Sequence, residues 1–234
     1  MELYAKIFKM KYAVFTYIFG KNEEFLREPK FLDDNIEFIC VTDQLSLKSD
    51  IWKIIYEPLE NVKSLRDKTA LTKFNPFKYT DADRIIIQDS SLECISSLSD
   101  LFMELEHCDI CLKKHPQREN LSQELPEWKV RGLSDNQINK FKNMAKNDGI
   151  KLSNVPLYEC CVIAIKNNKE IKELFNSLLS LMKLLGENGN MVVTQQCTFA
   201  YLIKTFYPNL KIGKINQNKF FTRYIHNSNK VNIL

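Results

Sequence analysis

The segment at residues 83–94, DRIIIQDSSLEC, places a carboxylate where an apolar run gives way to polar residues. Isoleucines dominate Arg84–Gln88, which predicts a buried strand, and Asp89 follows that strand directly, ahead of two serines. A carboxylate with hydroxyl neighbours can bind a divalent cation, which bridges phosphate oxygens and offsets the charge of a leaving group. Aspartate also caps turns, and this is the alternative explanation for its position.

A basic segment of helical period, RDKTALTK, precedes that strand. Arg66, Lys68 and Lys73 would lie within roughly two helical turns of one another. If this face points into the same crevice as Asp89, its charges can neutralise phosphates. The alternative is a solvated helix face, which lysines commonly form.

A histidine, an arginine and carboxylates gather after a later apolar run, in KHPQRENLSQE. His115 and Arg118 could grip a donor sugar or an acceptor, and Glu124 could act as a general base. Glu159 precedes another apolar run and is a second candidate base. Near the C-terminus His226 stands alone, and a lone histidine of this kind is commonly a surface residue.

Seven cysteines raise the question of disulfides or metal binding. The count is odd, and CDIC at residues 108–111 has no second pair of Cys or His at ligand spacing. Cys111 falls within a predicted strand, whereas a thioredoxin-type motif starts a helix. We therefore expect free, buried thiols in a reducing compartment, Cys160 and Cys161 included.

Charge and hydropathy exclude several classes of protein. The net charge of +4 is too small, and the lysines are too scattered, for a nucleic-acid-binding surface, so no nucleic-acid partner is expected. The N-terminal segment lacks the basic head and cleavage site of a signal peptide, and no apolar run reaches the ~20 residues of a membrane span. We expect a cytoplasmic protein, with peripheral contact to a membrane-bound acceptor and the oligomeric state left open.

Short apolar runs that alternate with helical segments fill the first half of the chain. We expect strands at residues 12–19, 37–42, 51–56, 84–88 and 108–113, a short helix within 20–35, a helix at 63–79 broken near Pro76, and a helix at 96–107. This alternation favours an open α/β sheet, whose ligands bind beyond the carboxyl ends of the strands. Asp89 would lie at that edge.

The second half is more polar and then strongly helical. We expect an excursion loop at residues 115–137, a helix at 134–146, a strand at 159–165 and a helix at 167–186 with an apolar stripe that faces the core. No repeat, low-complexity tract or linker divides the chain, so we expect a single domain over residues 1–234.

Several of these segments follow one another in a characteristic order. They are TYIFG after the first strand, Thr42-Asp43 at the end of the second, LTKFNPFKY, the acidic strand end at Asp89, KHPQRENLSQE, NQINKFKNMAKNDG, LYECCVIAI and TQQCTFAYLIK. In this order, from about residue 12 to residue 206, the chain resembles GT-A-type glycosyltransferases. Among these enzymes it resembles a glycosyltransferase-like family found in plants, bacteria and some large DNA viruses.

The resemblance implies a GT-A fold, a Rossmann-like open mixed sheet flanked by helices. Residues 12–115 would form a nucleotide-binding half, and residues 116–234 an acceptor-side half. The implied activity is transfer of a sugar from a nucleotide-diphosphate sugar to a glycan acceptor, with Mn²⁺ or Mg²⁺ as cofactor. The residues expected to bind the nucleotide sugar are Thr16, Gly20, Asp43, Arg66, Lys73, Asp89, His115, Arg118 and Gln196, and those expected to bind the metal are Asp89, Ser91 and His226.

The chain departs from this family at two places. The usual Asp-x-Asp reads Asp-Ser-Ser, and Gln195 stands where relatives have an aspartate. These departures leave open a degenerate, non-catalytic protein that binds sugars or partner proteins. A nucleotidyltransferase is the other alternative, but such enzymes have a glycine-rich phosphate loop, and only Gly20 lies near the first predicted strand.

Overall fold

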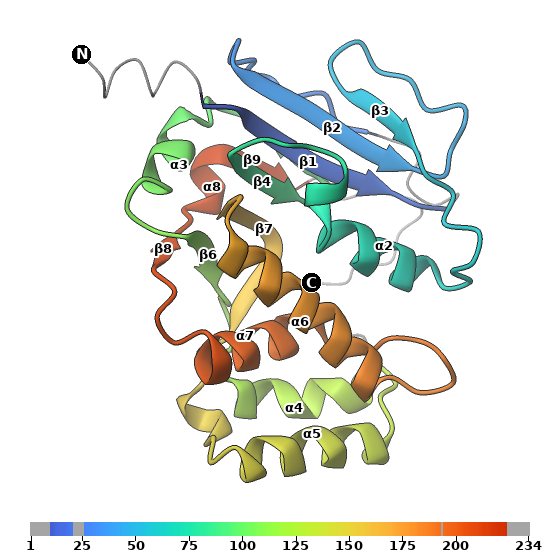
Figure 1. The fold of residues 1–234 in the computed structure, drawn as a ribbon, viewed down its shortest axis with the longest axis vertical. Helices are drawn as coiled ribbons and strands as arrows, with labels where there is room; N and C mark the ends of the chain where they lie inside the picture. The colour runs from blue at the N-terminus through green and yellow to red at the C-terminus, as the bar shows by residue number, and fades with distance from the viewer. Residues whose placement is uncertain (1–9, 21–25, 193, 224–234) are drawn as a thin grey trace.

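The computed structural model describes residues 10–20, 26–192 and 194–223, and within these a seven-stranded mixed sheet lies at the centre (Figure 1). Its strands are β1 (Tyr12–Ile18), β2 (Ile36–Thr42), β3 (Lys53–Tyr56), β4 (Arg84–Gln88), β6 (Ile110–Lys114), β7 (Tyr158–Lys166) and β8 (Ile212–Lys214). A separate pair of short strands is formed by β5 (Leu92–Cys94) and β9 (Phe221–Arg223).

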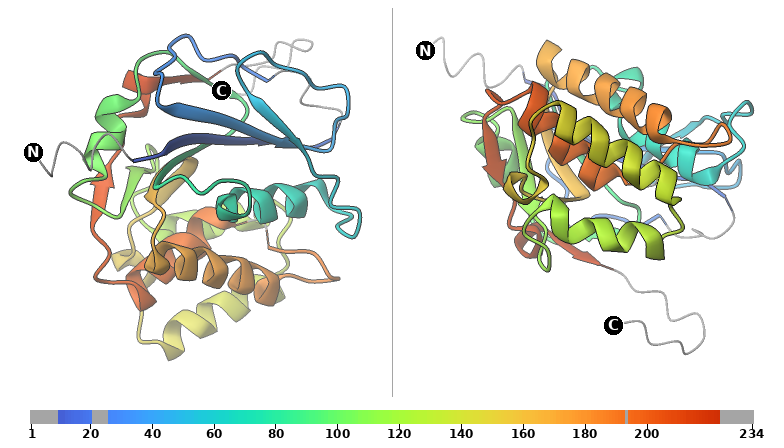
Figure 2. Two further views of the ribbon diagram at one scale, coloured as in Figure 1. Left: turned by 45° about the horizontal axis from the view of Figure 1, so that its top comes forward. Right: turned by 90° about the horizontal axis from the view of Figure 1, so that it is seen from below.

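Helices flank the sheet, and four of them form a layer of their own (Figure 2). The helices are α2 (Leu65–Lys73), α3 (Ser99–Glu104), α4 (Leu121–Val130), α5 (Asp135–Asn147), α6 (Lys169–Leu185), α7 (Gln195–Phe206) and α8 (Gln217–Phe220), with 3₁₀ turns at Pro76–Lys78 and Leu152–Asn154. The layer consists of α4, α5, α6 and α7. In the described part of the chain, no helix is both long enough and apolar enough to cross a bilayer.

The order of the strands explains where the chain changes direction. Across the main sheet the order is β3-β2-β1-β4-β7-β6-β8. β1 to β4 run parallel to one another, whereas β7 runs antiparallel to both β4 and β6. The carboxyl ends of β1 to β4 therefore share one edge with the amino end of β7. The expectation of an open mixed α/β sheet flanked by helices is confirmed.

Both faces of the sheet are covered by core, as the continuous apolar strands predict. Every residue of β4 is buried. Ile85 and Ile87 pack in the cluster that includes α6 and α7, whereas Ile86 packs on the opposite face with Leu101 and Phe102 of α3. This alternation follows from the two-residue period of a strand.

Several expected segments are confirmed with small shifts in their ends. The strand at 84–88 is β4, and the strand at 159–165 becomes β7. The helix at 167–186 is α6, where the side chain of Asn168 accepts a hydrogen bond from the amide of Ile171 and every residue of the expected apolar stripe is buried. The helix at 63–79 does end before Pro76, where a 3₁₀ turn follows α2.

Two expectations about secondary structure are wrong. The excursion loop expected at residues 115–137 contains α4, although Pro126 lies inside this helix. Asn120 caps its first turn, and α4 buries Leu121 and Trp128, so tertiary packing outweighs the proline. The short helix expected within residues 20–35 is not found at 26–35, which form turns and irregular chain, and residues 21–25 lie outside the described part.

Candidate functional site

The carboxyl edge of the parallel strands carries a pocket of about 230 Å³, which we call the edge pocket. Its lining residues are Lys73, Asp89, Arg131, Glu159, Cys160, Cys161, Gln195, Gln196 and Arg223. A neighbouring hollow of about 250 Å³, the side pocket, shares three of these residues. Its lining residues are Tyr17, Thr69, Lys73, Asp89, Ser90, Ser91 and Gln195. The sequence-based placement of Asp89 at the carboxyl edge of the sheet is therefore matched by the geometry, and a pocket lies there.

Asp89 and Lys73 form an ion pair between the two pockets. Lys73 Nζ lies 2.8 Å from Asp89 Oδ1, and the hydroxyl of Tyr17 donates to the same oxygen at 2.5 Å. The Lys73 side chain is only 3% exposed, whereas that of Asp89 is 33% exposed. A buried ammonium needs a partner to offset its desolvation, and Asp89 supplies it.

β4 and α2 hold this pair in place. Asp89 follows β4, and its amide donates to the carbonyl of Cys161 in β7 at 2.9 Å, which continues the pairing of the two strands. Lys73 is the last residue of α2, where a cation also interacts favourably with the helix dipole. The pair therefore joins the end of a strand to the end of a helix at one fixed place.

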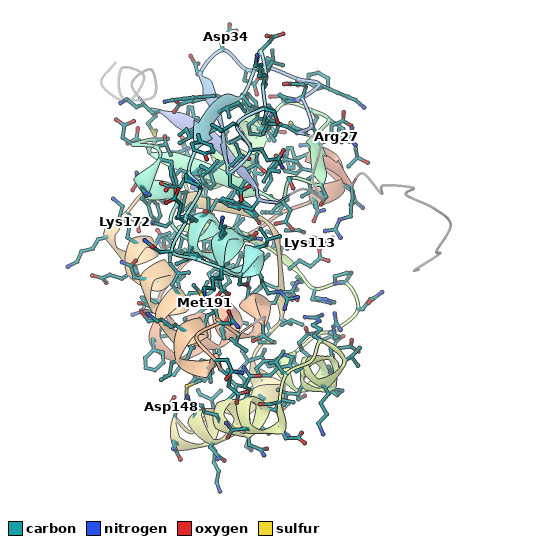
Figure 3. All side chains as sticks on the ribbon, turned by 90° about the vertical axis from the view of Figure 1, so that its right-hand side faces the viewer. Arg27, Asp34, Lys113, Asp148, Lys172 and Met191 are labelled. Atoms are coloured by element: carbon teal, nitrogen blue, oxygen red, sulfur yellow. The ribbon has the colours of Figure 1, made fainter. Side chains whose placement is uncertain are left out.

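Glu159 enters the edge pocket from the start of β7. Its Oε2 lies 2.6 Å from Lys113 Nζ, and the side chain is 18% exposed. A register shift between Leu112 and Lys113 in β6 pairs Lys113 with Glu159 across the two strands. Lys113 itself belongs to β6 and is labelled in Figure 3.

Two arginines bring further positive charge to the edge pocket. Arg131 follows α4, and its Nη1 lies 2.8 Å from Glu124 Oε1. Arg223 ends β9 and has no ion pair with any residue that the structure describes. Guanidinium groups match phosphate and carboxylate oxygens in a two-pronged geometry, so this part of the pocket suits an anion.

The start of α7 completes the wall of the edge pocket. Gln195 and Gln196 are its first residues, and Oε1 of Gln196 is buried without a hydrogen-bond partner among the described residues. The N-cap residue, Thr194, makes no side-chain capping bond. The amino end of a helix carries partial positive charge, which adds to that of the arginines.

The two cysteines in the pocket wall are not activated. Burial raises the pKa of Cys160 to about 12 and raises that of Cys161 as well. Both therefore stay protonated at neutral pH and are poor nucleophiles. All seven cysteines are buried and none forms a disulfide, as expected from the sequence.

Four of the expected site residues meet in the edge pocket: Lys73, Asp89, Glu159 and Gln196. Ser91 is exposed and lines the side pocket beside Asp89. Arg66 is exposed on α2 and lines neither pocket, so it is not brought together with Lys73.

Thr16 cannot face a nucleoside. Its side chain is fully buried, and its hydroxyl donates to the carbonyl of Gln88 at 3.0 Å. Because Gln88 is the last residue of β4, this bond fixes the strand end from which Asp89 projects. Thr16 therefore supports the site from inside the core.

Gly20 and Asp43 form a structural link between the ends of β1 and β2. The amide of Gly20 donates to Asp43 Oδ1 at 2.9 Å, and Lys68 Nζ lies 3.2 Å from Oδ2. Gly20 has φ +79°, and a Cβ added there would lie 2.7 Å from a methyl carbon of Leu65. The positive φ favours a glycine here, whereas the exposed Leu65 side chain could shift away, and the Asp43 carboxylate is already used.

His115, Arg118 and Glu124 lie outside the lining of both pockets. His115 Nδ1 accepts hydrogen bonds from the amides of Gln117 and Arg118, which stabilises the turn after β6. Arg118 Nε lies 2.7 Å from Glu124 Oε2. These residues form a local framework.

Glu124 cannot serve as a general base, contrary to the sequence-based expectation. Its side chain is fully buried between Arg118 and Arg131, so it cannot reach an acceptor hydroxyl. Both arginines form ion pairs with it, at 2.7 Å from Arg118 and 2.8 Å from Arg131. Burial raises the pKa of Glu124, and the two arginines oppose that rise. Its role is to hold Arg131 at the pocket.

The residues expected to bind a metal ion do not make a metal site in the described part of the chain. His226 lies outside it, and the described residues contain no group of three or more Asp, Glu, His or Cys side chains placed to hold an ion. Asp89 already has the ammonium of Lys73 beside one of its oxygens. Of the three expected ligands, the structure therefore describes Asp89 and Ser91 alone.

Sequence reasoning missed Arg131 and Arg223 as site residues, and took Tyr17 only for an apolar strand residue. Arg131 lies in a segment interpreted as loop, and Arg223 reaches the pocket only because β9 pairs with β5. No spacing in the sequence indicates either contact. The alternation along this strand places Tyr17 on the same face as Phe15. It does not predict the hydrogen bond from the Tyr17 hydroxyl to Asp89.

Comparison with protein-family models gave no match for this chain, and comparison with curated proteins gave none either.

Proposed function

We propose that the protein is a GT-A-type glycosyltransferase that moves a sugar from a nucleotide-diphosphate sugar to a carbohydrate hydroxyl. One observation carries the proposal: Lys73, Arg131 and Arg223 line the same pocket as Asp89 and Glu159, at the carboxyl edge of a parallel half-sheet. Open α/β sheets bind ligands at this edge, and cations there can stabilise a departing diphosphate.

The transfer requires one bond to break and one to form. The bond between the anomeric carbon and the diphosphate oxygen breaks, and its electron pair stays on the diphosphate. The acceptor oxygen forms the new bond to the anomeric carbon, and its proton passes to a carboxylate. Glu159 is the base in this proposal, because it lines the edge pocket and Lys113 holds its carboxylate in place.

Asp89 acts in this proposal as a positioning residue for Lys73. Its carboxylate fixes the ammonium at the pocket wall, and the hydroxyl of Tyr17 orients the carboxylate. An Asp89→Ala variant should fold and lose donor turnover by about a hundredfold, since misplacing a reacting or stabilising group by about 1 Å costs that much. The matched control is Asp34→Ala, at an exposed carboxylate ahead of β2 and away from the site (Figure 3).

The experiment that tests the function is a panel of nucleotide diphosphates and their sugars, with and without Mn²⁺. A bound donor should raise the melting temperature by mass action, and the same donor should be hydrolysed slowly in the absence of acceptor. Fully active Asp89→Ala protein would contradict the role of Asp89. A panel with neither a thermal shift nor hydrolysis would contradict the function itself.

One observation favours a second candidate, a protein that binds nucleotide sugars without turning them over. Both carboxylates of the edge pocket are ion-paired, Asp89 with Lys73 and Glu159 with Lys113. Gln195 supplies an amide, which cannot act as a general base, where a carboxylate could. Thermal shifts with a donor, combined with no hydrolysis and no transfer, would identify this binding protein.

A further inference from the structure

We infer that the edge pocket binds the diphosphate group with the protein's own cations, Lys73, Arg131 and Arg223, in place of a divalent metal ion. The identity of the diphosphate as part of a sugar donor rests on the proposed function. Metal-free binding of a pyrophosphate group is independent of that function and can be measured separately.

Lys73 already pairs with Asp89, the residue expected to bind a metal ion. Its ammonium is buried and lies 2.8 Å from Asp89 Oδ1, and the hydroxyl of Tyr17 contacts that same oxygen. A divalent cation bound by Asp89 would sit within a few ångströms of this ammonium, and like charges at that distance repel strongly away from bulk water. The ion pair therefore substitutes a fixed monovalent charge for a metal.

The arginines supply the charge that one lysine lacks. Arg131 is anchored by the buried carboxylate of Glu124, whereas Arg223 has no ion-pair partner among the described residues. Both line the edge pocket together with Lys73. Two guanidinium forks and one ammonium can contact several oxygens of a diphosphate at once, as phosphate sites commonly do.

The balance of charges in the pocket supports an anionic ligand. Among its lining residues three are cations and two are carboxylates. Glu159 pairs with Lys113, and Glu124, the partner of Arg131, is shared with Arg118, so the partners outside the lining leave the excess of positive charge in place. The amino end of α7, where Gln195 and Gln196 begin the helix, adds partial positive charge to the same wall.

The test uses the full chain and inorganic pyrophosphate, with binding measured by titration calorimetry in EDTA and again in Mn²⁺. We expect binding in EDTA that Mn²⁺ does not strengthen. Lys73→Met should weaken it by about ten- to hundredfold, because a hydrogen bond between charged groups is lost. Lys73→Arg should retain much of the affinity, and Lys142→Met, at an exposed lysine of α5, should leave it unchanged.

Asp89→Asn separates the two ways of binding the anion. If Asp89 binds a metal, Mn²⁺ strengthens pyrophosphate binding to the unchanged protein and no longer does so in this variant. If Asp89 holds Lys73, the variant binds pyrophosphate more weakly, because the buried ammonium has lost its partner, and Mn²⁺ changes the affinity of neither protein. Should Lys73→Met fail to fold, the double variant Lys73→Met/Asp89→Asn replaces the pair by neutral groups of similar size. The melting temperature and the pyrophosphate affinity of this double variant are then measured in place of those of Lys73→Met, and the same loss of affinity is expected.

Binding that is absent in EDTA and appears with Mn²⁺ would overturn the inference, as would a Mn²⁺-dependent gain in affinity that Asp89→Asn abolishes, or no binding under either condition. Its failure is distinguishable from failure of the proposed function. Sugar transfer that strictly requires Mn²⁺ would keep the function and reject the inference. Metal-free binding of pyrophosphate with no turnover of any donor would reject the function and keep the inference.

Discussion

At the scale of single residues, the clearest contrast is between two arginines. Arg66 has the sequence context expected of a phosphate ligand but is exposed on α2, whereas Arg223 has no such context and lines the edge pocket. Arg223→Ala should weaken donor binding by about tenfold, because a charge-assisted contact is lost. Arg66→Ala should not change it. Calorimetric titration of both variants with one nucleotide sugar checks this, and equal losses in the two would contradict the placement of the site.

His115 makes stability depend on pH in a predictable direction. Burial lowers its pKa, Arg118 lowers it further together with Arg131 and Lys113, and Glu159 opposes them. Because the folded-state pKa lies below that of the unfolded chain, the unfolded state binds more protons as the pH falls below about 6.5. The free energy of unfolding should therefore decrease as the pH falls from 7 toward 5.

Urea denaturation at a series of pH values measures this effect. A His115→Asn variant, whose side-chain oxygen can still accept from the neighbouring amides, should show a smaller decrease over the same range. An unchanged pH profile in the variant would show that the dependence arises elsewhere.

At the scale of elements, α4 links the fold to the site. It buries Trp128 against Phe141, with ring centroids 4.9 Å apart, and it delivers Arg131 to the edge pocket. Pro126 lies inside this helix and removes the hydrogen bond that its amide would make to the preceding turn. α4 therefore keeps its place through tertiary contacts rather than through its own helical propensity.

Pro126→Ala should consequently stabilise the protein. Pro126 is exposed, so the change leaves no cavity, and it restores a backbone hydrogen bond in α4. The gain should be about 1–2 kcal/mol, which is the difference in helix propensity less the greater freedom of the unfolded chain. Chemical denaturation measures it, with Pro116→Ala, in the turn ahead of α4, as the matched proline control. A destabilised Pro126→Ala protein would show that the proline has a packing role.

The elements also show how far sequence reasoning reaches. Continuous isoleucines predicted β4 and hence the position of Asp89, and the regular apolar stripe predicted α6, because both signals are local and repeated. α4 was missed, since its polar composition and its proline argue against a helix. The packing of Trp128 against Phe141, which stabilises it, is a tertiary contact that the local sequence does not indicate. Arg131 and Arg223 were missed for a related reason. Their position beside Lys73 depends on how segments distant in the sequence pack together, and no local sequence pattern indicates that packing.

At the scale of the whole molecule, the two halves of the chain share one sheet. β1 to β4 come from the first half, and β7 from the second half pairs with β4 along its whole length, from Arg84 opposite Lys166 to Gln88 opposite Val162. The edge pocket draws Lys73 and Asp89 from the first half and its remaining lining from the second. Site and fold should therefore be lost together on unfolding.

The two tryptophans of the chain make this prediction measurable, because one lies in each half. Trp52 is 3% exposed and packs edge-on against Phe38, and Trp128 is fully buried beside Phe141 in the other core cluster. In Trp128→Phe protein the fluorescence reports Trp52 alone, and in Trp52→Phe protein it reports Trp128 alone. A single cooperative domain requires that each fluorescence transition in urea coincide with the loss of far-ultraviolet circular dichroism in the same variant. Fluorescence of Trp52 that changes at a lower urea concentration than the dichroism would mean that the first half unfolds by itself, and the pocket would then be an interface between two independently folding parts.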